Sequence, residues 1–169
     1  MAQAERTVNP NMRLDAQLCF ALHAASRAFD GLYRVTLSEA GLTYPQYLVM
    51  LVLWEHGDLT VKELGRKLRL DSGTLSPLLK RLESAGWLER QRTAADERSV
   101  MVCLTEAGTE LQERACDVPL HSAASSGLNL AQATELRSLL AQLTESLDSA
   151  TGELATQLAA RVAADGHAE

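Results

Sequence analysis

Residues 60–104 decide the fold, and they read TVKELGRKLRLDSGTLSPLLKRLESAGWLERQRTAADERSVMVCL. A helix is predicted at the start of this stretch, because Thr60 and Glu63 have the spacing of a capping box. A short turn leads to a second helix, for which Asp71 or Ser72 is the expected N-cap. The apolar positions of the second helix recur at i, i+3, i+4 and i+7, namely at Leu75, Leu78, Leu79 and Leu82. The pattern therefore predicts two consecutive helices joined by a tight turn.

A β-hairpin is predicted after these helices. Gly86 stops the second helix, and two short strands are expected over residues 87–92 and 100–104. The second strand alternates apolar residues with others, as half-buried strands do: Val100, Val102 and Leu104. Helix, turn, helix and hairpin in this order predict a winged helix-turn-helix over residues 40–105. The fold class is mainly α-helical, with the small β-hairpin as its wing.

Further helices are predicted on both sides of this domain. Apolar residues recur at helical spacing over about 14–39, and a helix over 45–56 is apolar nearly all round, so we expect it to be buried. Downstream, we predict a helix over 106–117 that Pro119 ends, a polar stretch over 121–129, and then a long helix. The long helix carries one leucine stripe: Leu136, Leu139, Leu140, Leu143 and Leu147.

The outer helices lack a partner for their apolar stripes within this domain. A second copy of the chain is the most economical partner. We therefore expect residues 14–39 and 106–164 to form a helical dimerisation region around the winged helix-turn-helix of a homodimer. Residues 1–12 and 165–169 are expected to be flexible tails.

Composition excludes several classes of protein. The chain has 169 residues, and alanine (25) and leucine (30) supply a third of them, a mix that favours helix. The longest apolar run, Tyr47 to Trp54, is eight residues and too short to span a membrane. No apolar segment typical of a secretion signal opens the chain. The three cysteines have no disulfide-framework spacing, so a cytoplasmic location is expected.

Charge is unevenly distributed along the chain. The formal net charge is −6, yet residues 62–98 hold nine basic and six acidic residues, a net of +3, whereas the rest holds seven and sixteen, a net of −9. A basic island in an acidic protein is the layout expected when one face meets phosphate. The alternative is an ordinary solvated surface.

The outer face of the second helix suits a DNA groove. Small and hydroxyl residues, with Gly73 and Pro77 among them, permit close approach to base edges. A proline inside a helix costs ~3 kcal/mol and is better tolerated where shape serves binding. The alternative is a merely solvated amphipathic helix. The candidate DNA contacts on this helix are Ser72, Thr74, Ser76, Lys80 and Arg81.

The hairpin supplies three more candidates. Arg98 is placed to reach a minor groove, where narrow geometry concentrates negative potential. Asp96 cannot bind phosphate, so we expect it to orient Arg98 or Arg92 through a salt bridge. A purely structural wing is the alternative.

Three segments carry a resemblance to a known family. LDSGTLSPLLKRLESAGWLERQRTAADERSVMVCLTEAG (70–108) resembles the DNA-binding core of the MarR family of bacterial repressors. LDAQLCFALHAASR (14–27) and GLTYPQYLVMLVLWE (41–55) resemble its OhrR-type subgroup, which senses organic hydroperoxides through a cysteine. The resemblance implies that Cys19 is the peroxide-reactive thiol and that Tyr33 and Tyr44 hydrogen-bond it in the reduced state. His23 departs from the pattern, since such proteins often have another tyrosine there.

The spacing of Cys19 and Tyr33 constrains this site. They lie 14 residues apart on one predicted helix, ~21 Å along its axis, too far to touch. Either the helix breaks or Tyr33 comes from the other subunit, and the resemblance implies the second. Near a helix start, the macrodipole also favours the thiolate form of Cys19. The alternative for Cys19 is a small buried apolar residue.

The leading hypothesis is a homodimeric repressor that binds double-stranded operator DNA when Cys19 is reduced and releases it on oxidation by organic hydroperoxides. One alternative is a MarR-type repressor released by a small phenolic or other ligand. Another is a thiol peroxidase, although no Thr-x-x-Cys arrangement, acid/base pair or phosphate loop accompanies Cys19. We therefore expect no catalytic residues and no cofactor. No metal is expected either, because the histidines and cysteines lack metal-ligand spacing.

The fate of the oxidised thiol is also predicted. Some members of the subgroup resolve the sulfenic acid with a second cysteine before the final helix, but residues 121–127 contain none. Cys116 lies earlier and Cys103 lies in the wing, and a disulfide needs Cα atoms within about 7 Å. We therefore predict a one-cysteine sensor in which Cys19 forms a mixed disulfide with a small thiol or oxidises further.

Overall fold

The computed structural model describes residues 9–93 and 96–165. Two compact units divide the chain, one ending at Ser122 and the other beginning at Ala123. The predicted tails at residues 1–8 and 166–169 lie outside the described residues, whereas Pro10–Met12 forms a 3₁₀ turn.

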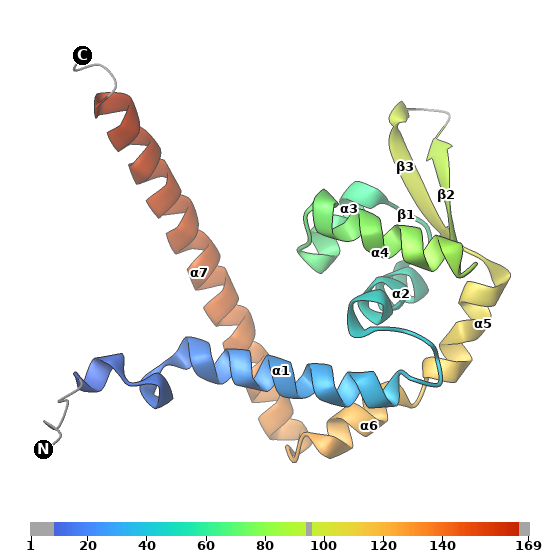
Figure 1. Cartoon of the computed structure of the whole chain (residues 1–169), viewed down its shortest axis with the longest axis horizontal. Helices are drawn as coiled ribbons and strands as arrows, with labels where there is room; N and C mark the ends of the chain where they lie inside the picture. Colours follow the sequence, from blue (N-terminus) through green and yellow to red (C-terminus); the bar gives the residue numbers. More distant parts are fainter. Residues whose placement is uncertain (1–8, 94–95, 166–169) are drawn as a thin grey trace, which may run out of the picture. The chain divides into compact units, whose positions relative to one another are not determined.

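The first unit contains the predicted helix, turn, helix and hairpin (Figure 1). Its helices are α1 (Leu18–Thr36), α2 (Tyr44–His56), α3 (Val61–Leu68), α4 (Ser72–Ser84), α5 (Glu106–Ala115) and most of α6 (Val118–Ser125). Its strands are β1 (Leu59–Thr60), β2 (Leu88–Thr93) and β3 (Asp96–Leu104). In Figure 1 the β2–β3 hairpin rises beyond one end of α4, so the wing and the second helix of the motif, here called the recognition helix, are neighbours. The predicted winged helix-turn-helix is confirmed.

Side-chain caps explain where these helices begin. The predicted capping box is present, with the Glu63 amide donating to Thr60 Oγ1 at 3.2 Å and the Thr60 amide donating to Glu63 Oε2 at 2.9 Å. Asp71 is the N-cap of α4, because its carboxylate accepts from the Thr74 amide at 2.9 Å. A second capping box at Thr43, not predicted from the sequence, starts α2 one turn before its apolar run.

The two strands of the wing belong to a three-stranded antiparallel sheet in the order β1-β3-β2, in which β3 is the central strand. β3 pairs with β2 from Leu104 opposite Leu88 onward, and with β1 at Leu59 opposite Val102. β1 is only two residues long, too short to leave a recognisable strand pattern in the sequence.

The core lies between α2, α4 and the base of the wing. Leu75, Leu79 and Leu82 of α4 are fully buried, as predicted, and Leu78 is half-buried. The Trp54 indole N–H donates to the Gly108 carbonyl at 2.9 Å, which ties α2 to α5. Burial of this one face of α4 leaves the opposite face open to solvent.

Three predicted boundaries are wrong. β3 begins at Asp96 instead of residue 100, so the hairpin loop is shorter than predicted. α1 begins at Leu18 instead of residue 14, because Leu14–Ala16 forms a separate 3₁₀ turn. Residues 118–125 form α6 where the end of one helix and a polar stretch were predicted. Pro119 lies in the first turn of α6, where its missing N–H costs no hydrogen bond, so it starts a helix instead of ending one.

The second unit is dominated by α7 (Leu130–Asp165), a single helix of 36 residues (Figure 1). Asn129 and Gln132 cap its start reciprocally, each amide N–H donating to the other's side-chain oxygen. The predicted leucine stripe lies on this helix, and most of its members are exposed within the single chain: Leu136, Leu139 and Leu147, continued by Leu154 and Leu158.

Candidate nucleic-acid interface and redox site

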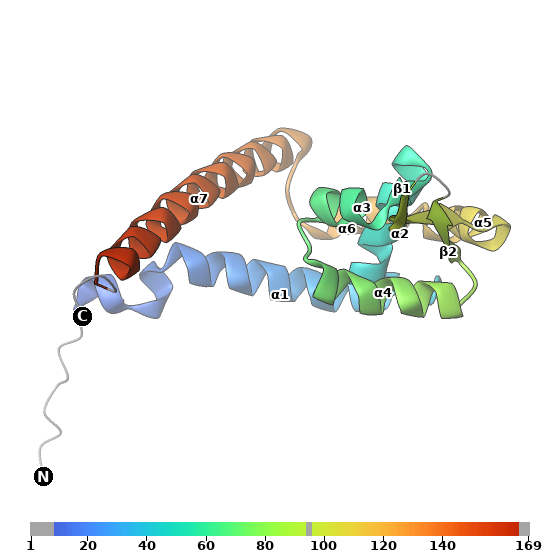
Figure 2. The same ribbon diagram turned by 90° about the horizontal axis from the view of Figure 1, so that it is seen from above.

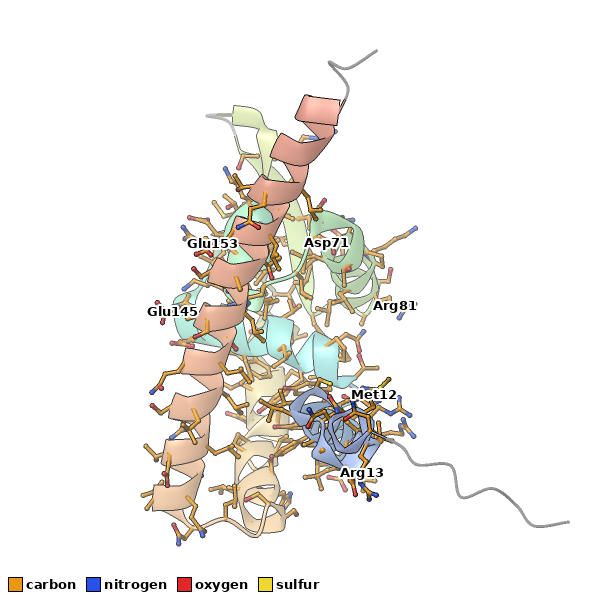
Figure 3. All side chains as sticks on the ribbon, turned by 90° about the vertical axis from the view of Figure 1, so that its left-hand side faces the viewer. Met12, Arg13, Asp71, Arg81, Glu145 and Glu153 are labelled. Carbon is orange, nitrogen blue, oxygen red and sulfur yellow. The ribbon has the colours of Figure 1, made fainter. Side chains whose placement is uncertain are left out.

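All five candidate DNA contacts on α4 are exposed: Ser72, Thr74, Ser76, Lys80 and Arg81. Figure 3 shows Arg81 pointing outward from α4. The buried leucines occupy the other side of α4, so these side chains surround its exposed surface, with Thr74 and Arg81 on one shoulder of the helix. The structure thus brings together a solvent-facing surface of hydroxyls and two cations.

The hydroxyl groups of this face are already oriented. Thr74 Oγ1 donates to Asp71 at 3.0 Å, and Ser76 Oγ donates to the Ser72 carbonyl at 2.6 Å. Hydrogen bonds from the Thr74 amide and hydroxyl lower the pKa of Asp71, so its carboxylate stays charged at neutral pH. Because both hydroxyl protons are engaged, each oxygen can serve a further partner only as an acceptor, which suits the amino groups of adenine or cytosine.

A groove runs between α3, α4 and the wing, and basic residues line it. Lys62 and Arg66 come from α3 and Arg90 from β2, beside Ser72 and Ser76 of α4. The sequence singled out none of these three cations, although all belong to the predicted basic island. Their excess of positive charge was the available signal, but only the packing of α3 against the sheet shows that they share a groove.

The wing is joined to α4 by an ion pair. Glu83 at the end of α4 accepts from Arg90 Nη2 at 2.6 Å and from the Arg90 amide at 3.2 Å. The hydrogen bond from the Arg90 guanidinium lowers the pKa of Glu83. Arg92 is exposed on β2, as a DNA contact requires. The side chains of Asp96 and Arg98 lie outside the described residues, so their predicted roles remain predictions.

The candidate redox residues fall into two groups. Tyr33 and Tyr44 stack with ring centroids 4.3 Å apart, and both are half-buried. Cys19 is exposed near the start of α1. α1 is unbroken from Leu18 to Thr36 (Figure 2), so Cys19 and Tyr33 of one chain are 14 residues, or ~21 Å, apart along one helix. The helix break considered above is therefore excluded.

The tyrosine pair belongs to a larger aromatic cluster. Tyr47 lies 6.1 Å from Tyr33 between ring centroids, and Tyr47 in turn contacts Trp54 at 6.2 Å. Burial, with a smaller contribution from Tyr33, raises the pKa values of Tyr44 and Tyr47. Both phenols therefore stay protonated, and able to donate, throughout the physiological range.

Ser122 is a residue of this cluster that the sequence did not indicate. Its side chain is buried, and its hydroxyl donates to the Tyr33 hydroxyl oxygen at 3.2 Å. The two residues are 89 positions apart, and Ser122 lies in a segment that was predicted to be irregular. Only the packing of α6 against α1 brings them together.

The other two cysteines occupy different environments. Cys103 is buried in β3, and burial, together with the neighbouring Asp58, raises the pKa of its thiol. Cys116 is exposed after the last turn of α5. A raised pKa lowers the thiolate fraction, so the Cys103 thiol is poorly suited to react with a peroxide.

The described residues contain no cluster of three or more His, Cys, Asp or Glu side chains that could hold a metal ion. In the same part of the chain, no helix is both long and apolar enough to cross a membrane. An exposed recognition helix, a basic groove and a hairpin wing define this molecule as a winged-helix DNA-binding protein.

Comparison with known proteins identifies the family. The family model described as transcriptional regulator SarA/Rot matches residues 31–114. The organic hydroperoxide resistance transcriptional regulator of Bacillus subtilis (strain 168) is 49% identical over 140 residues, 81% of this chain and 93% of the relative. The HTH-type transcriptional regulator TtmR of Methylorubrum extorquens (strain PA1) is 47% identical over 139 residues, 82% of this chain and 71% of the relative.

Solved structures of AbfR of Staphylococcus epidermidis are also similar. Reduced AbfR bound to DNA is 39% identical, with a TM-score of 0.70 and coverage of 82% of this chain and 94% of that one. Overoxidized AbfR bound to DNA is 40% identical, with a TM-score of 0.66 and coverage of 82% and 95%. The chain belongs to the MarR family of DNA-binding transcriptional regulators, in its OhrR-type group, as the resemblance of its motifs predicted.

Proposed function

We propose that the chain is a homodimeric repressor that binds operator DNA while Cys19 is reduced and releases it when an organic hydroperoxide oxidises Cys19. The observation that carries this proposal is the unbroken α1, which keeps Cys19 away from the Tyr33–Tyr44 pair of its own chain. A thiol that needs phenol donors must then find them in a second copy.

The uncovered apolar surface supports the homodimer. Leu18 is 62% exposed in the isolated chain, and Phe20 and Phe29 of the same helix are also exposed. The leucine stripe of α7 is uncovered as well. Apolar surface on this scale is a mark of an interface. In the proposed assembly, residues 14–39 and 106–164 form the dimerisation region, and residues 40–105 bind DNA.

The DNA-binding half of the proposal rests on α4, the groove and the wing. In a dimer, two recognition helices address half-sites about one helical turn, ~34 Å, apart. Lys62 and Arg66 line the groove and Lys80 and Arg81 are exposed on α4, and these four cations supply phosphate contacts. Ser72 and Ser76 line the same groove as Lys62 and Arg66 and read base edges.

The sensing step is a displacement on the peroxide. The Cys19 thiolate attacks the terminal peroxide oxygen, a sulfur–oxygen bond forms, and the oxygen–oxygen bond breaks. The alkoxide leaves with a proton as an alcohol, and the sulfur is left as a sulfenic acid. Phenol hydrogen bonds from Tyr33 and Tyr44 of the partner subunit stabilise the thiolate before the attack.

A small thiol completes the switch. Its sulfur attacks the sulfenic sulfur, water leaves, and Cys19 becomes a mixed disulfide. AbfR was crystallised on DNA in an overoxidized state. Because overoxidized AbfR is still bound to DNA in that crystal, we favour a bulky adduct over further oxygen addition as the event that releases DNA here. An adduct is larger than one or two oxygens and displaces the neighbouring helices more.

The test is a mobility shift on the DNA upstream of the chain's own gene, with and without an organic hydroperoxide and a small thiol. The reduced wild-type protein is expected to bind and the treated protein to release. Cys19→Ser is expected to bind equally and to lose the response, because serine fills the space but cannot form a sulfenic acid. Cys116→Ser serves as the matched control and is expected to respond as wild type does.

Two outcomes contradict the proposal. Release of DNA by oxidised Cys19→Ser would assign the sensor to another thiol. Sustained peroxide consumption in the presence of a reductant, without any change in DNA affinity, would favour the thiol peroxidase.

A further inference from the structure

Ser122 is one of two buried polar residues among those the structure describes. The other, Gln46, is accounted for by the capping box of α2, where its side-chain oxygen accepts from the Thr43 amide at 2.8 Å. Ser122 caps no helix and has Tyr33 Oη as its hydrogen-bond acceptor. Burying a hydroxyl costs free energy unless it is hydrogen-bonded, so this bond accounts for the presence of serine in the core side of α6.

The direction of the bond matters for the chemistry of Tyr33. When Ser122 Oγ donates and Tyr33 Oη accepts, the phenol's own hydrogen remains to be donated elsewhere. Stacking against Tyr44, at 4.3 Å between centroids, holds the ring in place. A hydroxyl that accepts one hydrogen bond is also a stronger donor in another, because the two bonds polarise each other. Tyr33 is therefore prepared to donate to a negatively charged acceptor.

We propose that Ser122 is a positioning residue of the sensing site, which acts through Tyr33 on the Cys19 thiolate of the partner subunit. The inference rests on the proposed function, in which Tyr33 donates to that thiolate. Ser122 orients the Tyr33 hydroxyl and strengthens it as a donor, which stabilises the Cys19 thiolate. It touches neither sulfur nor peroxide in this arrangement.

Other ionisable groups around Tyr33 also influence the site. Tyr44 and Tyr47 interact with Tyr33, and Asp30 of α1 contributes to the raised pKa of Tyr44. A change at Ser122 alters none of these groups. If removal of the Ser122 hydroxyl changes the reactivity of Cys19 only when the Tyr33 hydroxyl is present, the effect is due to the hydrogen bond between them.

The experiment measures the alkylation rate of Cys19 against pH in the reduced full-length protein. Cys103→Ala and Cys116→Ser are introduced in every variant, so that Cys19 is the one thiol observed. The cycle compares the parent, Ser122→Ala, Tyr33→Phe and the double variant. Ser122→Thr keeps a hydroxyl, and Ser125→Ala removes an exposed serine from the same helix as the matched control.

Ser122→Ala is expected to slow alkylation at neutral pH about three- to tenfold, because the thiolate is the form that reacts. The effect is expected to vanish in the Tyr33→Phe background and to be restored largely by Ser122→Thr. Ser125→Ala is expected to react at the parent rate. Thermal unfolding and the DNA affinity of the reduced protein are expected to be unchanged by Ser122→Ala.

Parent-like alkylation of Ser122→Ala, or an equal loss with and without the Tyr33 hydroxyl, would overturn the inference. If Ser122→Ala does not fold, the Ser122→Thr variant still tests the inference. Alkylation of Cys19 in Ser122→Thr as slow as in Tyr33→Phe would overturn it. The readout uses neither DNA nor peroxide. A failure of the sensing proposal itself appears separately, as continued DNA release by oxidised Cys19→Ser.

Discussion

Gly108 shows how a single residue connects the wing to the rest of the first unit. A Cβ at this position would lie 1.8 Å from the backbone carbonyl oxygen of Trp87, closer than any real contact. The Gly108 carbonyl also accepts the Trp54 indole N–H. The base of the wing, the start of α5 and the end of α2 therefore meet at a point where only glycine fits.

Gly108→Ala is expected to destabilise the protein by at least ~2 kcal/mol, because backbone and not a movable side chain must give way. Gly31→Ala in α1 is the matched control, since nothing in the chain lies within 4 Å of an added Cβ there. Chemical denaturation of both variants measures the difference. Equal stability of the two would show that the contact of Gly108 with Trp87 is not tight.

Cys103 gives the protein a predicted sensitivity to alkali. Its pKa in the folded state is raised above the ordinary thiol value of 9.0, mainly by burial. The unfolded chain therefore ionises first, and the stability that the neutral thiol contributes is full below pH 9.0 and is lost as the pH rises through the folded-state pKa.

The expected result is a fall in melting temperature above about pH 9 that is steeper in wild type than in Cys103→Ala. Cys116→Ala, at an exposed thiol, is expected to keep the wild-type slope. Thermal unfolding monitored by circular dichroism across this pH range measures it. If melting temperature falls with pH equally in all three proteins, ionisation of Cys103 does not cause the loss of stability.

Among the elements, α4 and β2 act as one unit because of the Glu83–Arg90 pair. The carboxylate holds both the side chain and the backbone amide of Arg90, and so sets the angle between recognition helix and wing. Arg90 also lines the groove, which raises the competing idea that it binds phosphate directly.

Charge exchange separates the two roles. If Arg90 positions the wing, Glu83→Gln and Arg90→Gln each weaken operator binding about two- to fivefold. The double variant Glu83→Arg, Arg90→Glu, which exchanges the two charges, then restores most of the affinity. The salt dependence of binding stays the same. If Arg90 instead binds phosphate, Arg90→Gln reduces the salt slope by about one and the exchange restores nothing. Fluorescence anisotropy titrations over a range of salt concentrations decide between them.

At the scale of the whole molecule, the two halves of the candidate redox site come from different ends of α1. Cys19 lies in its first turn and Tyr33 in its last, so the proposed site forms only between subunits. A second thiol that resolves the oxidised Cys19 must be accessible. Of the other two cysteines, Cys116 is exposed and Cys103 is buried.

Non-reducing gels of peroxide-treated protein test the one-cysteine prediction. The protein is expected to remain monomeric on such gels and to gain the mass of a small thiol when one is present. Cys116→Ser is expected to behave identically. A peroxide-dependent dimer that disappears in Cys116→Ser would move the protein to the two-cysteine class.

The sequence by itself determined the local structure of the DNA-binding domain. Apolar periodicity and the Thr60–Glu63 box depend on neighbours within one or two turns, so the helix order, the hairpin and the outward face of α4 could be predicted. The resemblance of its motifs likewise predicted the family. Short-range signals failed at β1 and at Pro119, where two residues or one proline are compatible with several structures.

The tertiary structure alone decided which distant residues meet. The sequence does not show that Ser122 contacts Tyr33, 89 residues away, or that Lys62 and Arg90 line one groove. It also does not show that a backbone carbonyl leaves no room for a side chain at Gly108. The physical reason is that such contacts depend on how whole elements pack. Packing is set by the shape of the entire core, which no short stretch of sequence encodes.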